Sequence, residues 1–283
     1  MLKILEPSDT AGGTRYGSTL YKTGLTCGKK AAYYAEQYEI SSGKGNGGNE
    51  DGALAIGTYF HKFMELYHGG RVDETMAIRT SDISDSNAAT EAFRLFGYYA
   101  SQINPDYYGK VVSTEDKIDE THPRWSAVCQ AVGGVPFTLK PDMVVDCDDS
   151  AIARLGSRGI ALPGPGRYMV DFKTRGRRDS LAQLKYEMDL QVLAYPVAYN
   201  AVAEGSGEPL VRGMILCEIY KTKQPDIAFF YVQTATGDAL GGLANSLRNS
   251  RRLIDAKLPL RGDACFSYNR CCELLEKGLC YGY

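Results

Sequence analysis

The sequence predicts an α/β protein in which a central β-sheet is flanked by helices and preceded by a helical N-terminal region. Helical periodicity dominates residues 1–109, and closely spaced strand patterns follow from Lys110. From Arg167 onward, strands alternate with long amphipathic segments. The composition, 44% hydrophobic and 23% charged over 283 residues, is typical of a folded globular chain. This element order favours one core sheet covered by helices.

The N-terminal region contains three predicted helices. The first runs from Thr19 to Glu39, with Ser18 as its candidate N-cap. The second covers Ala53–His68, where apolar residues recur at helical spacing. Residues 41–52, between these helices, are rich in glycine and predict a loop without a phosphate-loop pattern. The third helix covers Asp85–Ile103, because acidic and serine side chains at its start suit a helix N-terminus.

Strand patterns begin at Lys110. The first two predicted strands, Lys110–Ile118 and Gly134–Asp146, are followed by a turn rich in glycine and proline and by a third strand, Arg167–Arg175. We expect these strands to pair antiparallel, because few residues separate them. A helix, two strands and a last helix follow at Asp179–Glu204, Leu210–Tyr220, Ile227–Thr234 and Thr236–Ala256.

The pattern predicts one domain over residues 1–283. Its helical part is 1–109, its α/β core is 110–256, and a cysteine-rich segment, 257–283, is expected to pack back on the N-terminal part. The net charge is −2, so a polyanion must be bound by a local cluster of cations. We expect no membrane association, because no apolar run reaches the length of about 18 residues needed for a span. With no signal-peptide pattern, we expect a cytoplasmic location.

Asp171 and Lys173 lie two residues apart on a predicted strand, so both side chains project from one face. Val170 and Phe172 then pack on the other face. A carboxylate can hold a divalent cation, and a neighbouring ammonium can orient or deprotonate a water molecule or stabilise developing charge. An ordinary ion pair at a strand end is the alternative, and it is the commoner explanation of an isolated Asp-x-Lys.

Four further residues can converge on this pair. Asp142 lies near the end of the preceding strand, and two carboxylates form the oxygen-rich site that Mg²⁺ or Mn²⁺ prefers. His61, on the second helix, can supply a nitrogen ligand. Gln191 and Tyr195 are four residues apart and share one helix face. Singly, each has an ordinary explanation as a surface histidine, a turn residue, a polar helix residue or a core tyrosine. Their joint order favours a metal-dependent site.

This order of residues resembles the PD-(D/E)XK nuclease superfamily, and within it the RecB-like branch, which includes CRISPR-associated adaptation nucleases and many phage exonucleases. The resemblance extends over about residues 18–280, and it implies a restriction-endonuclease-like core with a central mixed β-sheet. The matching motifs are Gly57-x-x-x-His61-x-x-x-Glu65, Pro141-Asp142, Asp171-Phe172-Lys173 and Gln191-x-x-x-Tyr195.

The resemblance also implies roles for these residues. His61, Asp142 and Asp171 are expected to be metal ligands. Lys173 is expected to activate or position the attacking water, with Gln191 and Tyr195 completing the catalytic set beside the DNA strand. Glu115 stands on the preceding strand, where relatives often carry an acidic residue. We expect Arg175, Arg177 and Arg178 to bind DNA, since guanidinium groups grip phosphates; a solvated turn is the alternative.

The eight cysteines favour reduced thiols or metal ligation over disulfides, because the chain has no export signal. Some RecB-like nucleases bind a [4Fe-4S] cluster through one cysteine upstream of the histidine motif and three near the C-terminus. The resemblance implies such a cluster, although the family tail runs on to a last cysteine and this chain ends at Tyr283. Zinc ligation and unligated thiols are the alternatives. The expected ligands are Cys27, Cys265, Cys280 and one of Cys271 or Cys272.

Together, the residues and the resemblance imply a deoxyribonuclease that depends on Mg²⁺ or Mn²⁺ and hydrolyses phosphodiester bonds through one-metal or two-metal activation of water. The expected partner is DNA, as single strands or frayed duplex ends, and the expected mode is that of an exonuclease. The expected host is a bacterium, or the bacterial host of a phage. One alternative is an end-processing subunit that works with CRISPR adaptation or recombination proteins. Another is a DNA-binding module without catalysis.

Overall fold

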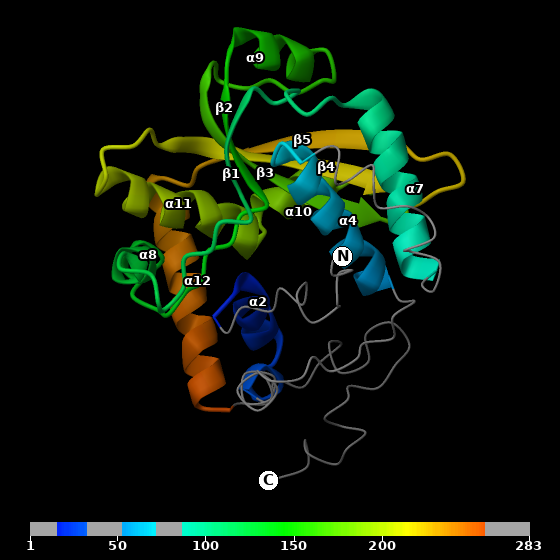
Figure 1. Cartoon of the computed structure of the whole chain (residues 1–283). Helices are drawn as coiled ribbons and strands as arrows, with labels where there is room; N and C mark the ends of the chain where they lie inside the picture. The colour runs from blue at the N-terminus through cyan, green and yellow to red at the C-terminus, as the bar shows by residue number, and fades with distance from the viewer. Residues whose placement is uncertain (1–15, 33–52, 72–86, 258–283) are drawn as a thin grey trace. The chain divides into compact units, whose positions relative to one another are not determined.

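A computed structural model describes residues 16–32, 53–71 and 87–257 of the protein (Figure 1). These residues fall into two compact units. In the described residues, the first unit comprises 53–71, 87–117 and 140–234, and the second comprises 16–32, 118–139 and 235–257. All but the first residue of the predicted C-terminal segment 257–283 lies outside the described residues.

The first unit is built on a mixed five-stranded sheet whose strands lie in chain order (Figure 1). Neighbouring strands pair antiparallel, except that β3 and β4 are parallel. This arrangement confirms the predicted α/β class with a central mixed sheet flanked by helices, and it is consistent with a restriction-endonuclease-like core. The strands are β1 (Lys110–Thr114), β2 (Met143–Cys147), β3 (Gly166–Arg175), β4 (Val211–Tyr220) and β5 (Ile227–Gln233).

β2 is shorter than the strand predicted at Gly134–Asp146. It begins only at Met143. Proline has no N–H to donate to a ladder, so Pro136 and Pro141 keep most of the predicted segment out of the sheet. Asp142 therefore immediately precedes the strand instead of lying within it.

β1 also ends earlier than predicted. It stops at Thr114, and the next residue, Glu115, has a left-handed backbone with φ of 53°. This conformation turns the chain out of the strand and rules out continuous pairing as far as Ile118. The Glu115 N–H donates to the carbonyl oxygen of Asp142 at 3.0 Å. The turn thus holds the end of β1 against the start of β2.

α4 (Ala53–His68) and α7 (Asn87–Gln102) pack on each other and on one face of the sheet. Both helices agree closely with the predicted ranges. The ring centroids of Phe63 on α4 and Phe96 on α7 are 5.4 Å apart. Burying such rings supplies roughly 1.5–3 kcal/mol each. The apolar stripe predicted on α4 is buried in this core through Phe60, Phe63, Met64 and Tyr67.

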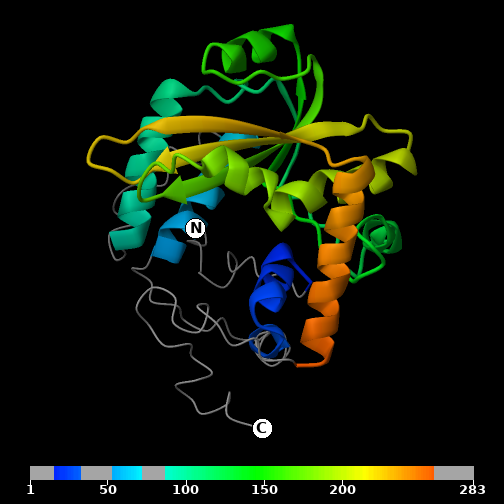
Figure 2. The ribbon, with the colours of Figure 1, turned by 180° about the vertical axis from the view of Figure 1, so that it is seen from behind.

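The opposite face of the sheet is covered by the crossover that joins the parallel strands β3 and β4 (Figure 2). This crossover contains α10 (Ala182–Glu187) and α11 (Leu190–Glu204). A single helix over Asp179–Glu204 was predicted, and this prediction is wrong at its centre. The Asp189 carboxylate accepts the backbone N–H groups of Gln191 and Val192, so it caps a new helix.

The short helix α9 (Asp149–Gly156) follows β2 and has a similar cap. The carboxylate of Asp148 accepts the backbone N–H of Ala151 at 2.7 Å. Like Asp189, Asp148 satisfies a backbone donor that the first turn of a helix leaves without a partner. α9 packs against β2, next to the edge strand β1.

The second unit contains α2 (Ser18–Thr26), α8 (Trp125–Ala131) and α12 (Gly237–Asp255). α2 packs on α12, and the Ser250 hydroxyl donates to the Tyr21 carbonyl at 2.7 Å. α12 confirms the helix predicted at the end of the core. α2 ends before Cys27, whose extended backbone interrupts the first predicted helix, and residues 33–39 of that prediction lie outside the described residues. Among the described helices, none is long and apolar enough to span a bilayer.

Candidate active site and metal centre

The pairing of β2 with β3 brings Asp142 next to Asp171. Met143 pairs with Val170, so the residue before Met143 lies beside the middle of β3. Asp142 Oδ2 accepts a hydrogen bond from the backbone N–H of Phe172 at 2.8 Å. One carboxylate is therefore fixed directly to the backbone of the segment that carries the other.

Asp171 is held from two sides. Lys173 Nζ lies 2.9 Å from Oδ1 and 2.8 Å from Oδ2. Gln191 Nε2, on α11, donates to Oδ1 at 3.0 Å. The side chains of Asp171 and Lys173 thus share one face of β3, as their spacing predicted, while Phe172 packs into the core on the other face. Oδ2 of Asp171 is buried and has no hydrogen-bond partner among the described residues, although the Lys173 ammonium lies 2.8 Å away.

The charges in this pair are mutually dependent. Burial raises the pKa of Asp171, and the negative charge of Asp142 raises it further. The Lys173 ammonium acts in the opposite direction but does not outweigh these effects. For Lys173, burial disfavours the charged form, but the carboxylates of Asp171 and Asp142 outweigh it and raise its pKa. Lys173 is therefore an ammonium at neutral pH.

His61 reaches the same site from α4. Its Nδ1 lies 3.1 Å from Asp142 Oδ2, and the two side chains are 28% and 14% exposed. Burial opposes charging of the imidazole, but the Asp142 carboxylate outweighs burial and raises the pKa of His61. Conversely, burial acts to raise the pKa of Asp142, while His61, Lys173 and the Phe172 N–H together lower it. His61 Nδ1 and Asp142 Oδ2 thus form a partly exposed pair that offers a metal ion one nitrogen and one oxygen ligand.

Glu115 completes a group of three possible metal ligands. One ligand atom each of His61, Glu115 and Asp142 lies within 4.8 Å of the others. Burial and the nearby Asp142 carboxylate raise the pKa of Glu115, while an ion pair with Lys140 opposes the increase. Sequence reasoning pointed to Glu115 only through the resemblance, because relatives often carry an acidic residue on the strand before Asp142. The left-handed turn at Glu115, which directs its side chain, could not be predicted from the spacing of residues in the sequence.

The structure brings together all three predicted metal ligands, but in two parts. His61 and Asp142 belong to the three-residue group with Glu115, whereas Asp171 lies outside that group and is engaged by Lys173 and Gln191. The donors fit a divalent cation, because carboxylate oxygens with one imidazole nitrogen suit Mg²⁺ or Mn²⁺. The buried oxygen of Asp171 is a further donor that lacks a hydrogen bond.

Tyr195 lies one helical turn after Gln191 on α11. Its side chain is only 6% exposed. The two residues share a helix face, as their spacing predicted. The amide of Gln191 contacts the Asp171 carboxylate, and Tyr195 is largely buried on α11.

The three predicted DNA-binding arginines differ in their partners. Arg175 donates to Glu218 at 3.1 Å and to the Tyr186 hydroxyl at 3.2 Å. Arg178 forms an ion pair with Asp226. Arg177 is exposed and makes no hydrogen bond or ion pair with the described residues. Arg177 is therefore the cation of this group that is most available to a phosphate.

Glu218 is a buried carboxylate that sequence reasoning missed. It lies on β4 directly opposite Lys173 on β3, and it is 2% exposed. Tyr186 and Tyr220 donate their hydroxyls to its two oxygens. Burial and the bond to Glu218 raise the pKa of Tyr186, so the phenol remains a donor. The sequence indicated this residue only as a glutamate within the otherwise apolar run Met214–Tyr220 of β4. Glu218 anchors Arg175 beside the site.

His68 supports the site strand from behind. Its ring stacks on Phe172, with centroids 5.7 Å apart and planes 11° apart. Nδ1 lies 2.9 Å from the Pro105 carbonyl oxygen, and Nε2 lies 2.9 Å from the Tyr99 hydroxyl. Because a carbonyl only accepts, Nδ1 carries the proton and Nε2 accepts from Tyr99. Burial lowers the pKa of His68 to about 4, so the ring is neutral.

Of the predicted cluster cysteines, only Cys27 lies among the described residues. It is a buried free thiol, and its Sγ accepts the Lys30 N–H at 3.5 Å. The other four lie outside the described residues and are Cys265, Cys271, Cys272 and Cys280. Two cysteines elsewhere, Cys147 and Cys217, are buried, and burial raises the pKa of each thiol to about 12.

No protein-family model matches the chain, and no curated protein sequence matches it. Among solved structures, the chain is similar to a protein from Eubacterium rectale that is described as a "putative exonuclease". The sequence identity is 16%, the comparison covers 90% of this chain and 88% of the other, and the TM-score is 0.45.

Proposed function

We propose that this chain is a metal-dependent deoxyribonuclease of the RecB-like PD-(D/E)XK type. The observation that carries this proposal is the ligand group of His61, Glu115 and Asp142, whose donor atoms lie within 4.8 Å of one another. This group adjoins the Asp171–Lys173 pair through the bond from Phe172 N to Asp142. Carboxylates, an imidazole and an ammonium at one strand end supply both a cation site and a positive charge for a phosphate.

His61, Glu115 and Asp142 would hold the cation, and Asp171 would contribute its buried Oδ2. A bound Mg²⁺ or Mn²⁺ would lower the pKa of water and offset negative charge on the phosphate. Carboxylate oxygens favour both ions, while the imidazole nitrogen is better accommodated by Mn²⁺. The oxygen-rich donor set therefore supports a hard divalent cation at this position.

Lys173 acts as a fixed cation in this proposal. The Asp171 and Asp142 carboxylates raise its pKa and favour the ammonium, which donates hydrogen bonds. Its charge stabilises the phosphate as bond cleavage adds negative charge. Gln191 keeps the Asp171 carboxylate oriented, since its amide binds the same oxygen that Lys173 contacts.

DNA as the substrate, and an end as the point of attack, are supported by the resemblance to RecB-like nucleases. Arg177 is placed to grip the backbone, because it follows Lys173 by four residues and is exposed. The proposed reaction is hydrolysis of phosphodiester bonds from the end of a single-stranded or frayed DNA.

The proposal includes a [4Fe-4S] cluster on Cys27 and three of the C-terminal cysteines, on the same resemblance. Thiolates suit an iron–sulfur cluster. An absorption spectrum of anaerobically purified protein tests it. A broad visible shoulder that disappears in Cys27→Ser, but persists in Cys129→Ser, supports the cluster, whereas a spectrum without visible absorption and without bound iron contradicts it.

A time course on end-labelled linear DNA and on circular single-stranded DNA tests the function. With Mg²⁺ or Mn²⁺, the purified protein should degrade the linear strand, and EDTA should stop the reaction. Lys173→Ala should lower the rate by about 10²–10⁴-fold while DNA binding is retained. Lys110→Ala, which replaces an exposed lysine at the start of β1, is the matched control and should be as active as the wild type.

Metal-stimulated cleavage by Lys173→Ala at the wild-type rate would contradict the proposed role of Lys173. DNA binding by the wild type without cleavage of any strand would instead favour the non-catalytic binding module. Cleavage of circular DNA as fast as linear DNA would contradict the exonuclease assignment.

A further inference from the structure

Three large apolar side chains are exposed on and next to the short helix α10. Leu181, Leu184 and Met188 are 55%, 52% and 72% exposed. Leu184 lies within α10, and Leu181 and Met188 are the residues that flank it as its N-cap and C-cap. The inward face of the same helix carries Ala182 and Tyr186, each only 4% exposed. We call the three exposed side chains the α10 ridge. Large exposed apolar side chains grouped in this way are typical of a contact surface.

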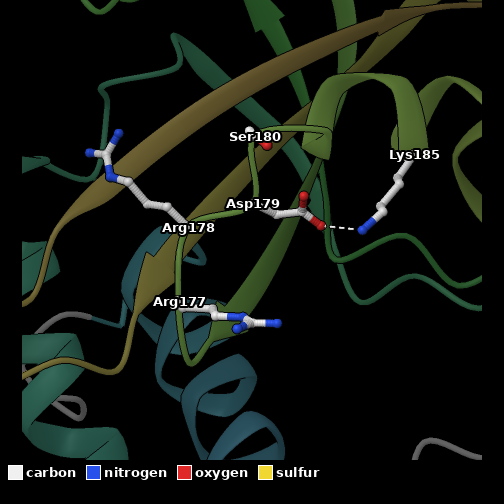
Figure 3. Close-up of a pocket in the computed structure, with 5 residues that line it drawn as sticks. All are labelled: Arg177, Arg178, Asp179, Ser180 and Lys185. Atoms are coloured by element: carbon white, nitrogen blue, oxygen red, sulfur yellow. Dashed lines mark hydrogen bonds and ion pairs between the residues drawn. The ribbon is translucent and has the colours of Figure 1, made fainter. Parts of the chain in front are cut away.

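A polar pocket of about 300 Å³ lies where the chain enters α10 (Figure 3). Two of its three cations are balanced within the chain, because Lys185 pairs with Asp179 and Arg178 pairs with Asp226. Arg177 is the third; it forms no ion pair with a carboxylate of the described residues, although its charge acts on the Asp179 carboxylate. Figure 3 shows Lys185 directed toward Asp179, while Arg177 and Arg178 extend from the loop in different directions. The lining residues are Arg177, Arg178, Asp179, Ser180 and Lys185.

The chemistry of this pocket suits a phosphate of a polyanion. A guanidinium offers several N–H donors to phosphate oxygens, and a serine hydroxyl can add another. The pocket adjoins the α10 ridge in sequence, since Lys185 lies between Leu184 and Met188. Cationic and apolar groups side by side match a nucleic-acid strand, which presents phosphates and base faces together.

Both features belong to the connection between β3 and β4, which also carries Gln191. Arg177 follows Lys173 by four residues, and Met188 precedes Gln191 by three. Gln191 in turn donates to Asp171. The Tyr186 hydroxyl on α10 accepts a hydrogen bond from Arg175, which follows Lys173 by two residues on β3, so α10 lies beside the strand that carries the Asp171–Lys173 pair.

We propose that residues 177–188 open the end of duplex DNA and deliver one unpaired strand to the site. Arg177 binds a backbone phosphate, and the α10 ridge packs against the terminal base pair and replaces its stacking. Apolar side chains that insert at base steps unstack the bases in this way. The inference rests on the proposed nuclease function and specifies its substrate as a strand separated from a duplex end by the enzyme itself.

A fluorescence measurement without cleavage tests this proposal. The probe is a blunt duplex with 2-aminopurine in its terminal base pair, mixed with the full-length protein in EDTA. The wild type should raise the fluorescence as the base leaves the stack, and Leu184→Ser with Met188→Ser should reduce the rise by about tenfold. The matched control is Leu210→Ser, which changes an apolar residue that is 45% exposed outside the α10 ridge.

The pocket is tested on the same probe. Arg177→Ala should weaken binding of single-stranded and duplex DNA alike and lower the salt dependence by about one counterion. An unchanged fluorescence rise in the ridge variant, or no rise with the wild type at saturating protein, would overturn the strand-opening proposal. Because this readout needs no cleavage, a wild type that opens ends but cuts nothing would refute the nuclease assignment alone.

Discussion

Each of the three carboxylates at the candidate site has a nitrogen partner within the chain, either an ammonium or an imidazole. A cluster of like charges would otherwise raise the pKa values of its members and destabilise the fold. The partners let the site form without an external cation, but a divalent ion that binds there must compete with them. The affinity of the site for a metal ion therefore depends on how strongly Lys173, His61 and Lys140 hold the carboxylates. The pairs are Asp171 with Lys173, Asp142 with His61, and Glu115 with Lys140.

The neutral ring of His68 predicts a pH-dependent stability. Its pKa is lowered to about 4 in the folded state from 6.5 in the unfolded state. Between these values the unfolded chain binds more protons, so stability falls as pH falls from 6.5 to 4. The loss should approach about 3 kcal/mol. Urea unfolding across this range should show a smaller pH dependence in His68→Phe than in the wild type.

His122→Gln is the control for the His68 prediction and should keep the wild-type pH dependence, because the ring of His122 is only partly buried. Equal pH dependence in the wild type and in His68→Phe would show that His68 is not the group that titrates. The His68 ring stacks on Phe172 in the packed core, and it stays neutral while that packing persists.

At the scale of elements, the break between α10 and α11 has a functional consequence. One continuous helix would follow the amphipathic pattern of Asp179–Glu204, but the Asp189 cap restarts the helix just before Gln191. Because the cap fixes the first turn of α11, it also fixes the amide that binds Asp171. Periodicity alone does not reveal such a restart, because apolar residues continue on both sides of Asp189.

Asp189→Ala should therefore affect both stability and activity. Loss of the cap should cost about 1 kcal/mol of unfolding free energy. The cleavage rate should also fall about tenfold, because Gln191 loses its fixed position beside Asp171. Chemical denaturation and the linear-DNA assay measure the two effects. Asp148→Ala removes the equivalent cap of α9 and should lose similar stability at nearly full activity. Equal activity losses in both variants would contradict a positioning role for Asp189.

At the scale of the whole molecule, the sequence was sufficient for the fold class and for the residues that share a strand or helix face. Asp171 with Lys173, and Gln191 with Tyr195, could be predicted because regular spacing determines direction. Glu115 required the early end of β1 and a left-handed turn, which periodicity does not encode. The cluster around Glu218 could not be predicted either, because it depends on the register between β3 and β4.

The most direct test of the metal centre is the rate of degradation of end-labelled single-stranded DNA as a function of Mn²⁺ concentration. The comparison is between wild type, Glu115→Gln and Asp116→Asn, where Asp116 is the exposed neighbouring carboxylate. If His61, Glu115 and Asp142 hold the cation, Glu115→Gln should need roughly 10–100-fold more Mn²⁺ for half-maximal rate. Asp116→Asn should match the wild type. An unchanged Mn²⁺ dependence in Glu115→Gln would contradict the assignment of this group as the metal centre.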